Sequence, residues 1–211
     1  MIDLPSRWKE TCTGLPDSLV SEAFERLRGL YDQPPRAYHN LSHIAACLAE
    51  FDHVRGKVND PTPIELAIWY HDCVYDFQAK GNEERSAEKA RKELEPLGFD
   101  SATIEEAVKL ILKTRHGIDL PETPDEKTMV DIDLSILGKS PEVFDRFERQ
   151  IREEYSWVLD AQFAAGRAAV LKTFLDRERV YETEFFHDRY EAHARENLKR
   201  SIASLTAKTS E

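Results

Sequence analysis

The chain has 211 residues, of which 41% are hydrophobic and 33% charged, a composition typical of a folded globular protein and not of a disordered one. Its 29 Lys and Arg against 40 Asp and Glu leave a net charge of −11, which disfavours nucleic-acid polymers and acidic membrane surfaces as partners. The sequence predicts a cytoplasmic protein for three reasons. Its three cysteines have no paired spacing, its start is polar, and it has no apolar stretch of membrane-spanning length.

Hydrophobic residues recur at helical spacing along nearly the whole sequence, and no segment alternates as a strand does. The predicted helices, in chain order, are 18–31, 38–54, 63–75, 83–94, 101–116, 129–137, 143–159, 161–180 and 185–205. Pro34-Pro35 ends the first of them, and Ser140-Pro141-Glu142 is a strong start signal for the seventh. The longest predicted loop is 118–127, which contains two prolines. We therefore expect an all-α fold.

Two histidines, His39 and His43, lie four positions apart in the predicted helix 38–54. This spacing places both imidazoles on one face of a helix. Such a pair is equally common as half-buried polar residues at a helix start, so the pair alone does not indicate a function.

The dipeptide His71-Asp72 lies inside the apolar helix predicted over 63–75. A buried imidazole and a buried carboxylate are costly unless they are paired or bound to a cation, and a divalent ion satisfies both. The alternative is a His–Asp hydrogen bond. The same dipeptide recurs at His187-Asp188, in a charged stretch without a neighbouring histidine, where we expect it on the surface.

Two acids, Asp131 and Asp133, interrupt the apolar helix predicted over 129–137. Residues two positions apart point to opposite sides of a helix, so at most one carboxylate faces a given site. A single buried acid of this kind could instead cap a neighbouring helix.

Taken together, the order His…His-Asp…Asp resembles the signature of the HD superfamily of metal-dependent phosphohydrolases, and most similar are small bacterial proteins described as predicted HD phosphohydrolases. The resemblance implies one helical domain over 1–211, with a metal-ligand core of about 36–138 on which helices of 140–205 pack. The segments that carry it are 36–44, 71–76, 82–87, 131–134 and 191–198.

The resemblance implies that the metal ligands are His43, His71, Asp72 and Asp133. The motif Tyr38-His39-Asn40-Leu41-Ser42-His43 is also similar to the opening motif of cyclic nucleotide phosphodiesterases, in which the first histidine protonates the leaving oxygen. Carried over, this makes His39 the general acid. The chain lacks the length and the nucleotide-clamping region of those enzymes, so their substrate does not follow.

Further residues are predicted more weakly. Glu83 is predicted as a catalytic residue or a ligand of a second ion, and His116 as a ligand of a second ion or of phosphate. Each has an equally good alternative role as a charge that complements a helix dipole. The predicted substrate-binding residues are Arg36, Tyr38, Asn40, Lys113 and Arg167, with Arg115 as a further cation. For most of the cations, a solvated surface position is the favoured alternative to phosphate binding.

The resemblance implies hydrolysis of a phosphomonoester or phosphodiester of a small molecule, such as a nucleotide, by water that a metal ion activates. One or two divalent ions are expected, drawn from Mn, Fe, Co, Mg, Ni and Zn. Imidazole titrates near neutral pH and suits a general acid. Two alternatives remain open: a di-iron oxygenase of the HD type, and a non-catalytic sensor in which the metal is structural. The oligomeric state is not predicted.

Overall fold

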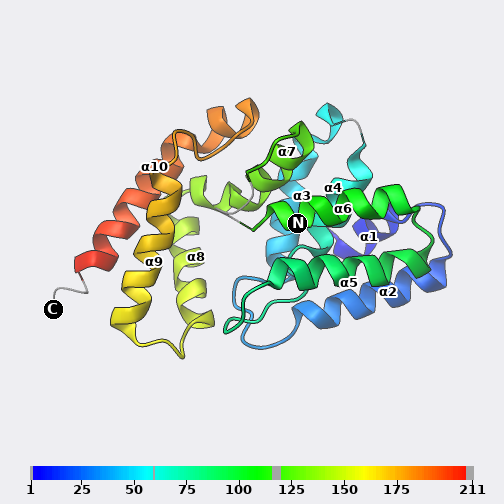
Figure 1. Cartoon of the computed structure of the whole chain (residues 1–211), viewed down its shortest axis with the longest axis horizontal. Helices are drawn as coiled ribbons and strands as arrows, with labels where there is room; N and C mark the ends of the chain where they lie inside the picture. The colour runs from blue at the N-terminus through cyan, green and yellow to red at the C-terminus, as the bar shows by residue number, and fades with distance from the viewer. Residues whose placement is uncertain (1, 59, 116–119, 208–211) are drawn as a thin grey trace. The chain divides into compact units, whose positions relative to one another are not determined.

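The computed structural model describes residues 2–58, 60–115 and 120–207. These ranges contain helices and no strand, so the predicted all-α class is confirmed. The α-helices are α1 (Leu4–Thr11), α2 (Asp17–Tyr31), α3 (Leu41–Asp52), α4 (Pro61–Tyr70), α5 (Asn82–Leu97), α6 (Ser101–Lys113), α7 (Pro124–Leu134), α8 (Pro141–Glu154), α9 (Asp160–Leu175) and α10 (Glu184–Ala207), joined by the short 3₁₀ helices η1 (Arg55–Lys57) and η2 (Ser135–Gly138) (Figure 1).

The chain forms two compact units, residues 1–130 and 131–211, and the division falls inside α7. Within the first unit α5 and α6 lie side by side, and within the second α9 and α10 do (Figure 1). No helix of the described ranges combines the length and the apolar character that crossing a membrane requires.

Helix α4 is the centre of the first unit. Every residue from Pro63 to Tyr70 is buried, and α1, α3, α5 and α6 all contact this helix. Its single charged residue, Glu65, lies 2.5 Å from the guanidinium groups of Arg7 and Arg55. A helix that is apolar on all sides is surrounded by protein. The C-terminal end of α4, where the His71-Asp72 dipeptide follows, is therefore firmly held.

Helix α3 begins three residues later than predicted. Asn40 is its N-cap, with an extended backbone and a side chain that accepts a hydrogen bond from the Ser42 amide at 2.8 Å. His39 therefore precedes the helix, and the prediction that His39 and His43 share a helical face is wrong. The physical reason is the preference of asparagine for the N-cap, where its carbonyl oxygen satisfies an amide that has no helical partner.

Helix α4 ends at Tyr70, five residues before the predicted end at Tyr75. The carbonyls that would continue it bind side chains instead: the Tyr31 hydroxyl donates to the Trp69 carbonyl, and Arg36 donates to the carbonyls of Asp72 and Cys73. The prediction that His71-Asp72 lies inside a helix is therefore wrong, because the dipeptide forms the turn after the helix.

Helix α7 begins at Pro124, inside the loop predicted over 118–127. The hydroxyl of Thr123 accepts from the Glu126 amide, and the Glu126 carboxylate accepts from the Thr123 amide. This is a capping box, and the proline occupies the first turn, where its missing N–H costs nothing. Helix α1 was not predicted, and the other predicted helix ends differ from the observed ones by up to five residues.

The second unit is stabilised by polar side chains of α10 that bind backbone groups. Asn197 donates to the carbonyls of Leu137 and Lys139, at 2.9 Å each. A Cβ atom at Gly138 would lie 2.5 Å from the Cβ of Tyr190, so this position excludes any side chain. Loop and helix therefore approach closely at η2.

Candidate metal centre

Two buried histidines meet where α3 begins and α4 ends. His43 lies in the first turn of α3 and His71 directly follows α4, and they are 4% and 1% exposed. Their Nε2 atoms are 3.1 Å apart. Residues 28 positions apart in sequence thus bring two imidazole nitrogens into direct contact.

The protonation of His71 follows from its backbone contact. Its Nδ1 lies 2.9 Å from the Ile68 carbonyl oxygen, an acceptor that requires the proton on Nδ1. In a neutral His71 with its proton on Nδ1, the lone pair of Nε2 is the one that can bind an ion. Two nitrogens bound to one ion at about 2.1 Å lie about 3.0–3.4 Å apart in octahedral or tetrahedral coordination, and the observed separation falls in this range.

The Asp72 carboxylate lies beside both histidines. Its Oδ2 atom is 3.2 Å from His71 Nε2 and 3.6 Å from His43 Nε2. Burial raises the pKa of Asp72, but the imidazoles of His71, His39 and His43 outweigh this effect and hold the pKa below its usual value. The carboxylate is therefore charged at neutral pH, and it offers an oxygen ligand next to two nitrogen ligands.

Asp133, the fourth predicted ligand, lies in the last turn of α7, after the point at which the chain divides into its two units. Within the first unit, the imidazoles of His43 and His71 and the carboxylate of Asp72 form a donor set that suits a divalent transition metal.

Asp131, two positions before Asp133, makes its described contacts within the second unit. Its carboxylate accepts hydrogen bonds from the amides of Glu182 and Thr183 and from the Thr183 hydroxyl, at 2.7–2.9 Å. Burial raises the pKa of Asp131 to about 6, although these bonds favour the charged form. Asp131 therefore caps the start of α10.

We expect Asp131→Ala to lower the free energy of unfolding by about 2–4 kcal/mol, because it leaves two backbone donors without their acceptor. Chemical denaturation measures this loss. The control is Asp145→Ala, which removes an exposed ion pair with Arg200 and should cost less than about 1 kcal/mol. Equal losses in the two variants would show that the cap contributes no more than a surface ion pair.

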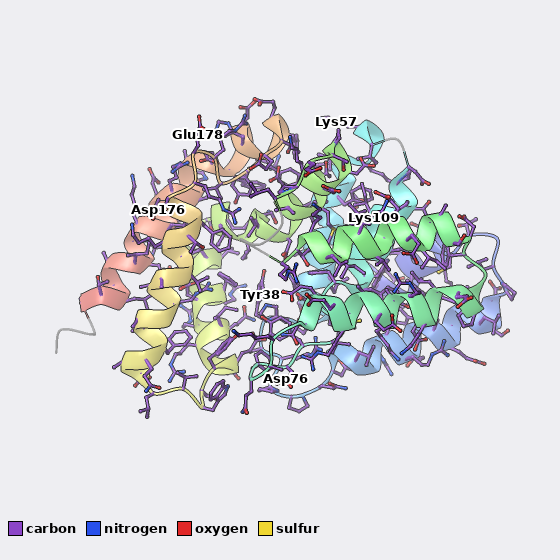
Figure 2. The ribbon with its side chains drawn as sticks, viewed as in Figure 1. Tyr38, Lys57, Asp76, Lys109, Asp176 and Glu178 are labelled. Carbon is purple, nitrogen blue, oxygen red and sulfur yellow. The ribbon has the colours of Figure 1, made fainter. Side chains whose placement is uncertain are left out.

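His39 lies beside the candidate ligand His43. Its ring centroid is 6.2 Å from that of His43, and its imidazole stacks on the Tyr75 ring at 3.9 Å with an interplanar angle of 21°. Phe77 packs against Tyr75 in turn, and the Tyr38 ring is 4.8 Å from that of His43. Aromatic side chains thus surround the two histidines of the first motif. In Figure 2, the label Tyr38 marks the loop before α3, which carries His39, and the label Asp76 marks the loop after α4, which carries Tyr75 and Phe77.

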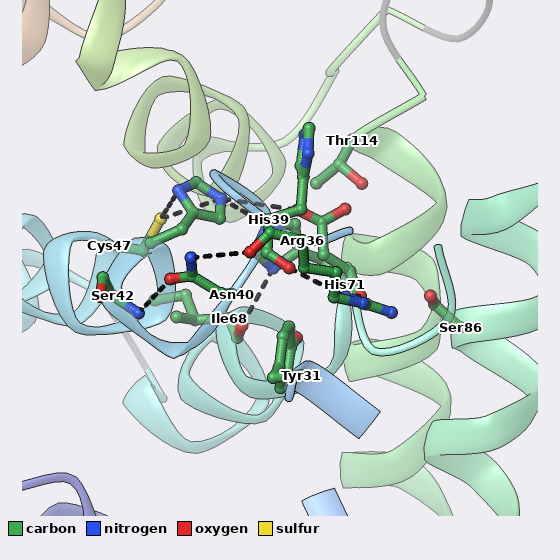
Figure 3. Close-up of polar contacts among 12 residues, drawn as sticks. Tyr31, Arg36, His39, Asn40, Ser42, Cys47, Ile68, His71, Ser86 and Thr114 are labelled. Atoms are coloured by element: carbon green, nitrogen blue, oxygen red, sulfur yellow. Dashed lines mark hydrogen bonds and ion pairs between the residues drawn. The ribbon is translucent and has the colours of Figure 1, made fainter. Parts of the chain in front are cut away.

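Asn40 and Arg36 contact backbone groups around the site. Asn40 donates to the carbonyls of Arg36 and Ala37, in addition to capping α3. Arg36 is buried, and its guanidinium donates to the carbonyls of His39, Asp72 and Cys73 (Figure 3). Both residues were predicted to bind substrate, whereas their described contacts are with the backbone.

The other predicted phosphate-binding cations are engaged with acids. Lys113 is 3.5 Å from the Glu126 carboxylate and donates to the Leu120 carbonyl. Arg115 pairs with Glu84. In the second unit, Arg167 pairs with Glu148 at 2.5 Å and lies over the Phe147 ring.

Glu83 and His116 are the two predicted ligands of a second ion. Glu83 is half-buried in the first turn of α5, where an acid complements the helix dipole. His116 lies outside the described residues.

The second His-Asp dipeptide lies in the first turns of α10. The Asp188 side chain is 80% exposed, and Glu184, His187 and Asp188 together offer a surface group of possible ligands. Glu184 is already paired with Arg179 at 2.8 Å.

We expect Asp188→Ala to leave the metal content of the protein unchanged within about twofold, because an exposed substitution of this kind disturbs little else. Elemental analysis of the purified variant measures this. Loss of the ion from a folded Asp188→Ala protein would place the metal on α10.

Two neighbours of the site were not predicted. Cys47 is buried, and its Sγ lies 3.7 Å from ring nitrogens of His43. Its position four residues after His43 on a helix is the signal that would have found it. The stacking of Tyr75 on His39 has no counterpart in the sequence pattern, because the two residues belong to separate loops.

The chain matches no family model, no curated protein and no solved structure. The resemblance to the HD superfamily therefore rests on the motifs of the sequence.

Proposed function

We propose that this chain is a metal-dependent phosphohydrolase that acts on a phosphate ester of a small molecule, with one or two divalent ions held by His43, His71, Asp72 and Asp133. The observation that carries the proposal lies within the first unit: the Nε2 atoms of His43 and His71 are 3.1 Å apart, and the Asp72 carboxylate lies 3.2 Å from His71 Nε2 and 3.6 Å from His43 Nε2. The order of these residues in the sequence, which resembles that of HD phosphohydrolases, supports it.

A divalent ion in such a site promotes the ionisation of water and offsets the negative charge of phosphoryl oxygens. The chain supplies the charge balance, because two carboxylates and two neutral imidazoles offset a charge of +2. His71 is fixed in the tautomer that a ligand needs by its bond to the Ile68 carbonyl.

His39 is the proposed general acid, which gives a proton to the departing oxygen. Its imidazole lies next to the ligands and is held by the face of Tyr75. This stacking fixes the plane of the His39 ring beside the ligand His43.

The decisive experiment is a screen of the purified protein, loaded with Mn²⁺, against phosphomonoesters, phosphodiesters and nucleotides, with released phosphate or alcohol measured. Activity that disappears with a chelator and returns with the ion supports the proposal. Bound metal without turnover of any ester would favour a sensor. An oxygen-dependent optical spectrum of the iron-loaded protein, again without ester hydrolysis, would favour the di-iron oxygenase.

A further inference from the structure

A single buried arginine joins the two segments that carry the proposed metal ligands. Arg36 Nη1 donates to the His39 carbonyl at 3.0 Å and to the Asp72 carbonyl at 2.7 Å, and Nη2 donates to the Cys73 carbonyl at 3.1 Å. The first of these carbonyls belongs to the loop before α3. The other two belong to the turn after α4.

These two segments hold different halves of the site. The loop before α3 leads into His43 within four residues of His39, and the turn after α4 contains His71 and Asp72. The Nε2–Nε2 separation of 3.1 Å depends on how the two segments are placed relative to each other. Within the first unit, the guanidinium bridges them next to the ligands.

We infer that Arg36 is a positioning residue of the metal centre, which sets the spacing of the ligand pair by binding the backbone on both sides of it. The inference rests on the proposed function, since it concerns the same site. It assigns Arg36 a contact with protein carbonyls in place of the contact with a substrate phosphate that the sequence suggested.

The surroundings of Arg36 fit this role. The residue is 9% exposed, its guanidinium carbon lies 5.3 Å from the Tyr31 ring centroid, and the Tyr31 hydroxyl is itself bound to the Trp69 carbonyl. The buried Nε atom of Arg36 has no hydrogen-bond partner in the described part of the chain. An unsatisfied buried donor costs free energy, so the three carbonyl contacts are what hold the guanidinium in this position.

Lysine cannot replace arginine in such a contact. The planar guanidinium directs its donors in fixed directions, whereas an ammonium group is a single point that reaches fewer carbonyls. The change R36K therefore keeps the charge and loses the bridge.

The chain offers a matched control in its second unit. Arg195 also donates to three carbonyls, those of Leu175, Arg177 and Glu178, at 2.6–3.1 Å. None of these residues belongs to the proposed centre. The change R195K thus removes the same kind of bridge and tests whether a general loss of stability weakens metal binding.

The test compares Mn²⁺ affinity, by calorimetric titration of metal-free protein, with the thermal midpoint of each metal-free protein. We expect R36K to bind Mn²⁺ about 10–100-fold more weakly than the unmodified chain, the range measured for residues that orient metal ligands. R195K should bind within about twofold of the unmodified chain, even if its midpoint falls by as much as that of R36K.

Equal affinities of R36K and the unmodified chain would overturn the inference while leaving the metal centre intact. Equal losses in R36K and R195K would overturn it as well, because they would reflect stability alone. Absence of Mn²⁺ binding by the unmodified chain would instead remove the proposed centre and the inference with it. If R36K is partly unfolded, the titration is repeated in sucrose, which favours the folded state, and the same criteria apply.

Discussion

Asp72→Asn is expected to weaken metal binding by more than about 100-fold, beyond the 10–100-fold typical of residues that only orient ligands. The substitution keeps the size of the side chain and removes the negative charge that lies 3.2 Å from His71 Nε2. An amide oxygen is a poorer ligand than a carboxylate and does not offset the charge of the ion. Elemental analysis and a Mn²⁺ titration measure the loss, and hydrolysis should disappear with it.

The same substitution at Asp76 is the control. Asp76 lies on the same loop, its side chain is 51% exposed, and its Oδ1 accepts from the Gln78 amide, a bond that an asparagine can also make. Asp76→Asn should keep full metal content. Metal retained by the Asp72→Asn protein would exclude Asp72 as a ligand.

His39→Ala is expected to retain the metal and to lose about 10²–10⁴-fold in turnover, the usual contribution of a positioned proton donor. The loss should be largest for alkyl phosphates. It should shrink for p-nitrophenyl phosphate, because a departing oxygen that is already a stable anion gains little from a proton. Steady-state kinetics with both substrates, together with metal analysis, test the assignment.

His53→Ala is the matched control for this experiment. His53 is the exposed residue that caps the other end of α3, and its removal should change turnover by no more than about twofold. Loss of metal from the His39 variant would make His39 a ligand. An equal loss of rate for both substrates would make it a residue that orients the substrate.

The fold class and the approximate positions of most helices could be predicted from the sequence, because hydrophobic residues recur at helical spacing throughout. The short helix α1 escaped this approach, since only Trp8 and Thr11 of its eight residues are buried. The start of α7 was missed for a different reason. Its prolines favoured a loop, although Thr123 and Glu126 form a capping box whose spacing is visible in the sequence.

The end of α4 could not have been predicted from local sequence. No glycine or proline follows Tyr70 for ten residues, so the helical pattern continues without a stop signal. The helix ends there because the carbonyls of Trp69, Asp72 and Cys73 are bound by side chains of Tyr31 and Arg36, more than thirty positions earlier. Only the folded chain brings these donors and acceptors together.

For the candidate site too, the sequence predicts which residue types are present, whereas their contacts and burial come only from the structure. The residue types and their order predict His43, His71 and Asp72 as ligands, and the first unit brings these three side chains together. The sequence predicts Arg36 as a phosphate-binding cation or a surface residue, because it shows the charge of this side chain and not its burial. Asp131 and Asp133 could be told apart in principle by helical geometry, but only the structure shows that Asp131 binds the amides of Glu182 and Thr183.

The complete burial of α4 has a consequence for how the first unit opens in solution. When neighbouring helices cover a helix on every side, its amide hydrogens exchange with solvent only after those neighbours separate from it. We therefore expect the amides of Leu66–Tyr70 to be among the slowest in the chain to take up deuterium. His71 directly follows this helix, and its amide bonds to the Ala67 carbonyl at 2.8 Å. We therefore expect the His71 imidazole to be attached to a part of the first unit that opens rarely.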